Sequence, residues 1–255
     1  MSDTLEVNIS LPDGYRALHF SDIDSTNEEA KRQAAAGASA GLWLVADEQS
    51  AGRGRHGRTW VSHAGNLHAS LLLYPACDLS HIPELSFVAA LAVAKTVGHF
   101  TDHAKITCKW PNDVLVDGAK IAGILLESES PGQPQKPYVI IGIGLNIAVY
   151  PELADYPATC LADHTKAVGV TAVFEILAAK LAEAVTRWGV DGFGPVRVEW
   201  LNMAEGIGKR IAIASGTETR SGTFIGLGKN GALLLEDEGG GLHEIVSGTI
   251  LKDSD

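Results

Sequence analysis

The chain has 255 residues, of which 45% are hydrophobic and 20% are charged, and its formal net charge is −11. This composition predicts a globular protein with a sizeable core, and the acidic balance argues against a general nucleic-acid binder, which would present a basic face. The sequence contains no apolar run of membrane-spanning length, and its N-terminus lacks the basic and apolar regions of a signal peptide.

The first hundred residues alternate predicted strands with predicted helices. Strands are expected at residues 15–20, 42–46 and 67–74, and helices at 24–36 and 83–100. Ser25 with Glu28, or Thr26 with Glu29, has the spacing of a capping box, and Gly37 is a suitable residue to follow the end of the first helix.

The middle of the chain predicts a hairpin, a buried strand and two more helices. Strands at 105–110 and 114–116 flank Pro111-Asn112-Asp113, and Asp117-Gly118 then predicts a tight turn into a strand at 120–127. A loop is expected at 131–137 and an apolar strand at 138–147. Helices are expected at 171–188, with Gly189 following the last turn, and at 195–203.

From about residue 206 the helical period disappears. Short strands are expected at 210–214, 220–226, 232–235 and 242–250, with a hairpin signal at Asn230-Gly231 and a loop tip at 239–241. The pattern predicts an α+β protein in which a mixed β-sheet flanked by helices fills residues 1–205. A small SH3-like β-barrel is expected to follow at residues 206–255.

The three cysteines are too few and too widely spaced for a metal site or a disulfide framework. They are Cys77, Cys108 and Cys160. We therefore expect buried structural thiols in a protein of the reducing cytoplasm.

The segment from Gly52 to Arg58, here called the arginine loop, holds three arginines and three glycines in seven residues. Adjacent guanidinium groups repel one another unless an anion lies among them, so the segment predicts a mobile loop that orders around phosphate or carboxylate groups. It also matches G-x-G-x-x-G, but a strand rather than a helix is expected after it, which argues against a dinucleotide-binding turn. A solvated basic loop without a ligand is the third interpretation.

Three other segments carry candidate chemistry, each beside an ordinary structural explanation. Lys109 to Asp113 could meet a nucleotide's phosphates, its base and a metal, but Pro, Asn and Asp are also favoured in β-turns. Lys120 opens an apolar strand and either reaches solvent or takes part in chemistry. Gly142 and Gly144 indicate either close approach of the backbone to a ligand or β-bulges.

Together these motifs resemble the biotin protein ligase family. The resemblance extends from about residue 15 to the end of the chain, and the arginine loop followed by Lys-Trp-Pro-Asn-Asp is its most specific part. Only 23 residues precede Asp24, so we expect the ligase-only form, without the N-terminal DNA-binding domain that some members carry. The matching segments are Asp24–Asn27, Gly52–Trp60, Gly65–Leu67, Lys109–Asp113, Lys120–Glu127, Gly142–Asn146 and, in the small domain, Gly228–Leu233.

The resemblance implies an ATP-dependent ligase with two half-reactions. Biotin and ATP give biotinyl-5′-AMP, and biotin then passes to one lysine of a biotin carboxyl carrier domain, of acetyl-CoA carboxylase or a related biotin-dependent carboxylase. Mg²⁺ is implied by the triphosphate. A cytoplasmic enzyme without nucleic-acid or membrane partners is expected, and a homodimer is compatible with the resemblance.

The resemblance also assigns roles to individual residues. The catalytic cations would be Lys120, Arg53 and Arg55, with the arginine loop closing over the intermediate to exclude water. Asp113 is a candidate metal contact. The biotin site would comprise Ser25, Thr26, Asn27, Gln49, Gly52, Arg53, Gly54, Arg55, Lys120 and Gly123, and the ATP site Arg55, Trp60, Lys109, Asn112, Lys120 and Asn146.

Two alternatives to a biotin ligase remain at this point. A lipoate or octanoate ligase shares the general architecture, but would have an apolar acyl tunnel and no need for the arginine loop. A non-catalytic biotin sensor or transcriptional regulator would bind biotin without transferring it and would require a DNA-binding module.

Overall fold

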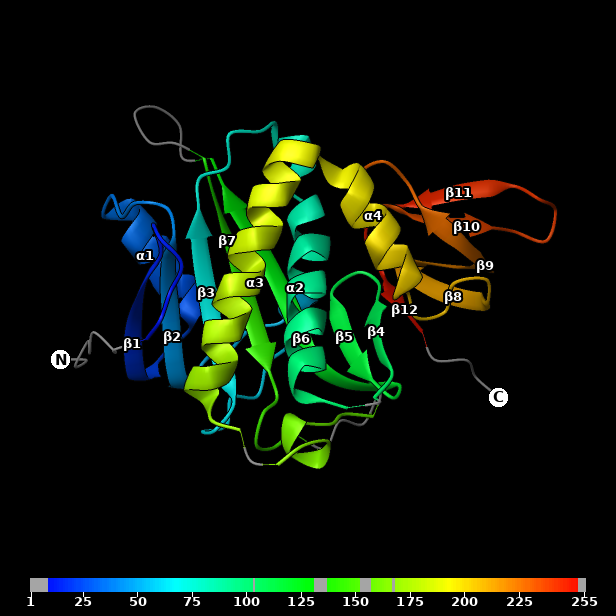
Figure 1. Ribbon diagram of the computed structural model, residues 1–255. Helices are drawn as coiled ribbons and strands as arrows, with labels where there is room; N and C mark the ends of the chain where they lie inside the picture. Colours follow the sequence, from blue (N-terminus) through cyan, green and yellow to red (C-terminus); the bar gives the residue numbers. More distant parts are fainter. Residues whose placement is uncertain (1–8, 103, 131–136, 152–156, 167, 252–255) are drawn as a thin grey trace.

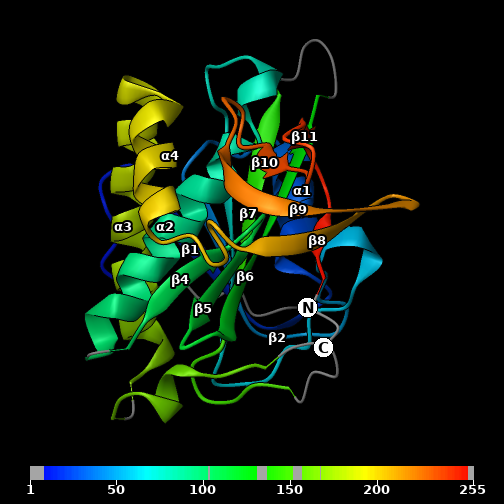
Figure 2. The same ribbon diagram turned by 90° about the vertical axis from the view of Figure 1, so that its right-hand side faces the viewer.

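The computed structural model describes residues 9–102, 104–130, 137–151, 157–166 and 168–251. Its main body is a seven-stranded sheet, and a second, five-stranded sheet is attached to one end (Figure 1). In the view turned by 90°, the strands of the second sheet run across those of the first (Figure 2). The predicted α+β class, with helices around a mixed sheet and a small β domain after it, is confirmed.

The larger sheet is mixed because one of its strand pairs is parallel. The strand order is β1-β2-β3-β7-β6-β5-β4, in which β1 pairs with β2 in parallel and every other pair is antiparallel. The strands are β1 (Arg16–Ile23), β2 (Leu42–Gln49), β3 (Leu67–Leu73), β4 (Ile106–Lys109), β5 (Asp113–Val116), β6 (Ala119–Glu129) and β7 (Tyr138–Leu145).

Helices cover both faces of this sheet. Helix α1 contacts β2, β3 and β7, whereas α2 and α3 pack on each other across the other face (Figure 1). Short 3₁₀ turns lie at Arg55–Gly57, Leu79–His81 and Leu161–Asp163. The α-helices are α1 (Thr26–Ala35), α2 (Glu84–Phe100), α3 (Val170–Asp191) and α4 (Phe193–Asn202).

The alternation of side chains along β2 divides the core into two parts. Trp43 and Val45 belong to the larger cluster under α2 and α3, and the Trp43 ring meets Phe174 edge-on at 5.3 Å. Leu42 and Leu44 join the smaller cluster under α1. This is the period of two expected of a strand that is buried on both faces.

The ends of the helices differ in part from the prediction. Ser25 stands at the N-cap of α1, but its side chain makes no capping bond, so the capping-box interpretation is wrong. Gly37 is confirmed: its φ is 84°, and Ala38 donates to the carbonyl of Gln33, which is a Schellman end. In α3 the helix continues through Gly189 because one glycine costs only about 1 kcal/mol, and it ends at Gly192, whose φ is 72°.

The tight turns were predicted correctly where the structure describes them. Asp117 and Gly118 have φ values of 50° and 82° and join β5 to β6, as the hairpin signal required. Gly231, with φ of 79°, lies in the turn between β9 and β10. Of the predicted loop at 131–137, only Pro137 lies within the described residues.

The C-terminal sheet contains one strand more than predicted. Its order is β11-β10-β9-β8-β12, with all pairs antiparallel. The predicted strand at 242–250 is two strands at opposite edges of this sheet. Residues 246–248 join them, and four Cα steps reach at most about 14 Å, so the sheet must curl towards a barrel. The strands are β8 (Arg210–Ser215), β9 (Glu218–Leu227), β10 (Leu233–Glu236), β11 (Leu242–Ile245) and β12 (Thr249–Ile250).

A buried tryptophan attaches the small sheet to the main body. Trp110, which follows β4, donates its indole N–H to the carbonyl oxygen of Gly231 at 3.1 Å. The ring of Phe87 lies against the same glycine and meets Trp200 edge-on at 5.3 Å. Part of the Lys109–Asp113 segment is therefore core.

The cysteines are free thiols, but not all are buried. Cys108 and Cys160 are buried, and burial raises the pKa of Cys108 to about 12. Cys77 is exposed in the connection after β3, so the prediction of a buried thiol is wrong there. The reason is local, since the chain leaves the sheet before this residue. None of the helices that the structure describes could cross a membrane.

Gly231→Ala is expected to destabilise the protein more than Gly240→Ala. Both glycines have positive φ, 79° and 80°, so both substitutions carry a strain of about 1–2 kcal/mol. A methyl group at 231 would also run into the Phe87 ring, whereas nothing lies within 4 Å of one at 240. We expect a further loss of about 1–3 kcal/mol at 231, measured by urea denaturation. Equal losses for the two variants would contradict the role of the Phe87 contact.

Candidate functional site

A cleft of about 560 Å³ lies where the arginine loop, the larger sheet and the C-terminal strand meet. Its wall includes the start of α1, the turn after β4, the open face of β6 and β7, and residues 249–251 of the small domain. The predicted residues that line it are Ser25, Thr26, Asn27, Gln49, Arg53, Gly54, Arg55, Trp60, Lys109, Asn112, Asp113, Lys120 and Gly123.

Two predicted residues do not line the cleft. Gly52 lies at the base of the arginine loop, where the Trp60 carbonyl and the Ser62 hydroxyl leave no space for a side chain. Asn146 is buried after β7, and its side-chain amide donates to the carbonyl of Thr159 at 3.1 Å. Its polar group therefore serves the packing of two chain segments.

The arginine loop forms a small hairpin of its own. Gly54 donates to the carbonyl of Arg58 at 2.7 Å, and Trp60 donates to that of Gly52 at 3.0 Å. One 3₁₀ turn occupies its tip, where His56 has a φ of 55°. The next strand or helix is β3, so the dinucleotide-binding interpretation, which requires a helix there, is wrong.

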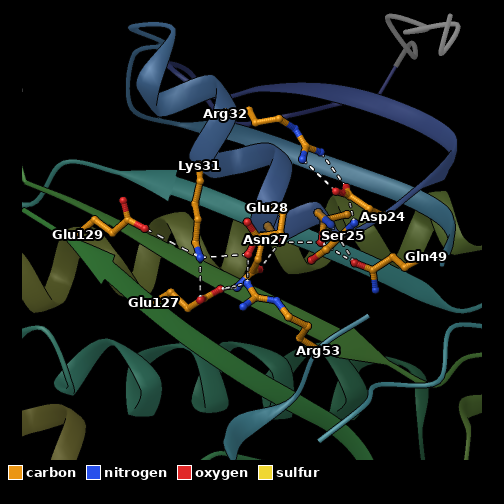
Figure 3. Close-up of polar contacts among 12 residues, drawn as sticks. Asp24, Ser25, Asn27, Glu28, Lys31, Arg32, Gln49, Arg53, Glu127 and Glu129 are labelled. Carbon is orange, nitrogen blue, oxygen red and sulfur yellow. Dashed lines mark hydrogen bonds and ion pairs between the residues drawn. The ribbon is translucent and has the colours of Figure 1, made fainter. Parts of the chain in front are cut away.

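The structure relieves the repulsion between Arg53 and Arg55 by giving them different partners. Arg53 pairs with Glu28 at 2.5 Å and with Glu127 at 2.7 Å (Figure 3). Arg55 turns towards the small domain, where the hydroxyl of Ser247 and the carbonyl of Gly248 each lie 3.4 Å away. Burial lowers the pKa of Arg55, but a guanidinium stays protonated at any physiological pH.

Lys120 is a cation buried within the cleft. Only 9% of the residue is exposed, and its ammonium pairs with Asp113 at 2.8 Å. The same nitrogen lies 5.5 Å from the centre of the Trp60 ring, within the range of a cation–π contact. The interpretation in which Lys120 reaches out to solvent is therefore wrong, and the lysine belongs to the cleft.

A connected polar network fills the end of the cleft beside α1. The backbone N–H and the hydroxyl of Thr26 lie 2.9 and 3.1 Å from Oε1 of Gln49. Ser70 of β3 is fully buried and lies 2.7 Å from the Thr26 hydroxyl and 2.5 Å from Oδ1 of Asn27. The amide nitrogen of Asn27 donates to Glu127 at 2.7 Å (Figure 3).

The glycines of β7 allow two of these side chains to approach the sheet. A methyl group at position 142 would run into the amide of Asn27, and one at 144 into the indole of Trp60. Gly142 and Gly144 pair with Ser70 and His68 without a break in register, so the interpretation of these glycines as bulges is wrong. They make room for protein side chains.

Several residues of this region had no clear signal in the sequence. Ser70 appears as a small residue in an apolar strand, and Glu28 and Glu127 appear as ordinary surface carboxylates. Residues 249–251 come from the other end of the chain. A polar residue within a largely apolar strand was a usable signal, and in β3 it marks His68 as well as Ser70.

Asp113 is the only carboxylate among the described residues that line the cleft. No group of three or more His, Cys, Asp or Glu side chains able to hold a metal occurs within the described ranges. Mg²⁺ usually binds proteins through one or two carboxylates together with substrate phosphates and water. The residues present therefore fit a magnesium ion that enters with a triphosphate better than a resident metal.

Profiles of two protein families match the chain. The family described as "Biotin/lipoate A/B protein ligase family" matches residues 20–146, and "Biotin protein ligase C terminal domain" matches residues 206–253. The biotin–[acetyl-CoA-carboxylase] ligase of Paracoccus denitrificans is 40% identical over 224 residues, which cover 85% of this chain and 92% of that protein. The bifunctional ligase/repressor BirA of Bacillus subtilis is 31% identical, over 93% of this chain and 74% of that protein.

Solved structures show the same architecture. The biotin protein ligase of Aquifex aeolicus in complex with biotin and ATP matches with a TM-score of 0.78 and 29% identity, over 92% of this chain and 97% of that one. The Leishmania major enzyme in complex with biotinyl-5-AMP matches with a TM-score of 0.63 and 26% identity, over 92% of this chain and all of that one.

Glu28→Gln is expected to speed trypsin cleavage within the arginine loop by about two- to fivefold. It removes one of the two carboxylates that hold Arg53, and an exposed ion pair contributes at most about 1 kcal/mol. When opening is fast, the cleavage rate follows the open fraction. Glu29→Gln is the matched control, because Glu29 pairs with Arg32 instead. Equal cleavage of both variants and the wild type would contradict the anchoring of Arg53 by Glu28.

Proposed function

The chain belongs to the biotin/lipoate A/B protein ligase family, and on that premise we propose that its cleft joins biotin to ATP. The protein is a biotin protein ligase: it activates biotin as biotinyl-5′-AMP and transfers the biotin to a lysine of a biotin carboxyl carrier domain. The observation that carries this assignment is the convergence of Lys109, Lys120, Arg53 and Arg55 on one cleft in a chain whose net charge is −11.

In the first step two anions must meet. A carboxylate oxygen of biotin attacks the α-phosphorus of ATP, a P–O bond forms, and the bond to the departing pyrophosphate breaks. Preorganised cations offset the repulsion of the approaching groups and stabilise the charge that develops in the transition state. We propose that Lys120 does this at the carboxylate and the α-phosphate, exchanging Asp113 for the substrate anions.

The two ends of the cleft suit the two substrates. We propose that Ser25, together with the network of Thr26, Asn27 and Gln49, binds the polar head group of biotin. The nucleotide would lie at the other end, near Trp60, Lys109 and Asn112. This division is supported by the positions of the residues. The first group lies at the start of α1 and the end of β2. In the second group, Lys109 ends β4 and Asn112 follows it, and the Trp60 ring lies against Gly144 of β7.

In the second step the amine of the carrier lysine attacks the carbonyl carbon of the mixed anhydride. A C–N bond forms, AMP leaves and a proton is released from the amine. Because water would attack the same carbon, the intermediate must be covered until the carrier arrives. We propose that Arg53, Gly54 and Arg55 provide this cover, with Arg55 already turned towards residues 247 and 248.

Mg²⁺ would be held chiefly by the triphosphate, with Asp113 as its protein contact. When bound, the ion would neutralise negative charge on the phosphates. Asp113 would then have two roles, as the partner of Lys120 before the substrates bind and as a magnesium contact afterwards.

Three finer assignments are also proposals. The carrier domain of acetyl-CoA carboxylase, or of a related carboxylase, is the proposed acceptor, as the name of the Paracoccus relative suggests. A cytoplasmic location is proposed from the free thiols. The catalytic domain is proposed to end at residue 205 and the small domain to begin at 206, a division that agrees with the separate C-terminal match at 206–253.

Lys120→Ala is expected to lower the rate of biotinyl-5′-AMP formation about 10²–10³-fold, the usual loss when one preorganised charge is removed. Lys95→Ala is the control, because Lys95 lies on α2 and pairs with Glu199, away from the cleft. The assay measures biotin-dependent pyrophosphate release and the mass gain of a carrier domain, with lipoate offered in parallel. If the carrier domain gains no mass with biotin, or gains mass with lipoate alone, the assignment is refuted. If K120A is fully active, the role of Lys120 is refuted.

Substitutions at two glycines of the same strand should separate the two substrates. Gly144→Ala would displace Trp60, and Gly142→Ala would displace Asn27. We expect the first to raise KM chiefly for ATP and the second chiefly for biotin, each by about tenfold or more, since displacing a packed side chain typically costs about 1–3 kcal/mol. Steady-state kinetics with each substrate varied in turn would check this. The opposite pattern would contradict the proposed ends of the cleft.

A further inference from the structure

Glu127 lies beside the cleft and has no role in the chemistry described so far. Glu127 belongs to β6, in which every second residue lies on the same face of the sheet. It therefore shares a face with Gly123 and Leu125, which line the cleft. Its carboxylate accepts from Asn27 at 2.7 Å, from Lys31 at 3.0 Å and from Arg53 at 2.7 Å. One side chain thus joins the sheet, helix α1 and the arginine loop (Figure 3).

The bond to Asn27 decides which way that amide points. Asn27 is 4% exposed, and its amide lies against Gly142. Its nitrogen faces Glu127 and its oxygen faces Ser70. Because a carboxylate can only accept hydrogen bonds, the reversed orientation would place two acceptors against each other. Glu127 therefore fixes the orientation of an amide that the cleft presents to a ligand.

Glu127 belongs to a small cluster of ion pairs. Glu28 and Glu127 face Lys31 and Arg53, with separations between 2.5 and 3.1 Å. Burial raises the pKa of Glu127, but hydrogen bonds from Asn27 and Lys31 outweigh it and leave the pKa below its ordinary value. The carboxylate is therefore charged across the physiological range, and it can hold Arg53 at the rim of the cleft.

We propose that Glu127 is a positioning residue for biotin: it fixes the amide of Asn27 in the orientation that receives the head group and anchors Arg53 at the same end of the cleft. This inference rests on the proposed function, because it assigns Asn27 to the biotin end. Lys31 supports it by compensating part of the charge of Glu127. The selectivity of the cleft then depends on a carboxylate that need not touch the substrate.

Glu127→Gln tests the proposal. The glutamine keeps the size of the side chain, but it is neutral and has one acceptor oxygen. Asn27 and Arg53 share one oxygen of Glu127 and Lys31 takes the other, so the glutamine cannot accept from Asn27 and Lys31 together. We expect KM for biotin to rise about tenfold, since a hydrogen bond to a charged group contributes on the order of 1.5–3 kcal/mol. KM for ATP and kcat should stay within about threefold, because Arg53 keeps Glu28 and an exposed ion pair is worth little.

Glu129→Gln is the matched control. Glu129 lies on the same strand and also faces Lys31, at 3.9 Å, but half of its side chain is exposed and its hydrogen-bond partner is Tyr138 rather than Asn27. It should leave both KM values unchanged. An equal rise in KM for biotin in the two variants would overturn the proposal, because it would trace the effect to charge alone.

A double-mutant cycle shows whether Glu127 acts through Asn27. In an Asn27→Ala background, Glu127→Gln should change KM for biotin by less than about twofold, because coupled residues are not additive. The full tenfold effect in that background would overturn the role of Asn27.

Glu127→Asp is a second test, which does not depend on the folding of E127Q. The aspartate keeps the negative charge but has a shorter side chain that cannot reach Asn27 equally well, so KM for biotin should still rise. A wild-type KM in E127D would also overturn the proposal.

The wild-type protein separates this inference from the function on which it rests. Biotin-dependent pyrophosphate release by the wild type is measured first. If biotin is not activated at all, the proposed function and this inference both fail. If the wild type is active and E127Q has the wild-type KM for biotin, only the inference fails. Thermal melting of each variant confirms that folded proteins are compared.

Discussion

The mutual repulsion of cationic side chains around one cleft is the constraint on which the rest of the site depends. Lys109, Lys120, Arg53 and Arg55 all line a space of about 560 Å³. Cations held this close need anions between them or separate partners. The fold supplies Asp113 for Lys120, Glu28 and Glu127 for Arg53, and hydrogen-bond acceptors of the small domain for Arg55. These partners offset the positive charge, and Asp113 is the acidic partner that lines the cleft.

The same partners explain how an acidic protein can bind two anionic substrates. At Lys120, Asp113 would be exchanged for a substrate carboxylate or phosphate, whereas Glu28 and Glu127 would keep Arg53 in place. The cost of ordering the cationic side chains is met largely during folding, which is the advantage of a preorganised site. The glycines of β7 complete the arrangement, since Asn27 and Trp60 approach the sheet only where side chains are missing.

Much of the fold could be predicted because its signals are local. Apolar runs, alternation and turn residues fixed the core strands, the hairpin at Asp117-Gly118 and the main helices. The errors had local as well as distant causes. The Ser25 side chain does not cap α1, Gly189 does not end α3, and the predicted last strand divides because its two halves pair at opposite edges of a curled sheet.

The sequence alone determined the chemical content of the site, since arginines, lysines and amides at characteristic spacings identify a family and its reaction. It could not determine which of these groups face one another. The pairing of Arg53 with Glu127 joins residues 74 positions apart, and that of Arg55 with Ser247 joins residues 192 apart. Such contacts depend on how β6, α1 and the small domain pack. Only the tertiary structure could therefore reveal that Glu127 orients Asn27, and that the C-terminal strand closes the cleft.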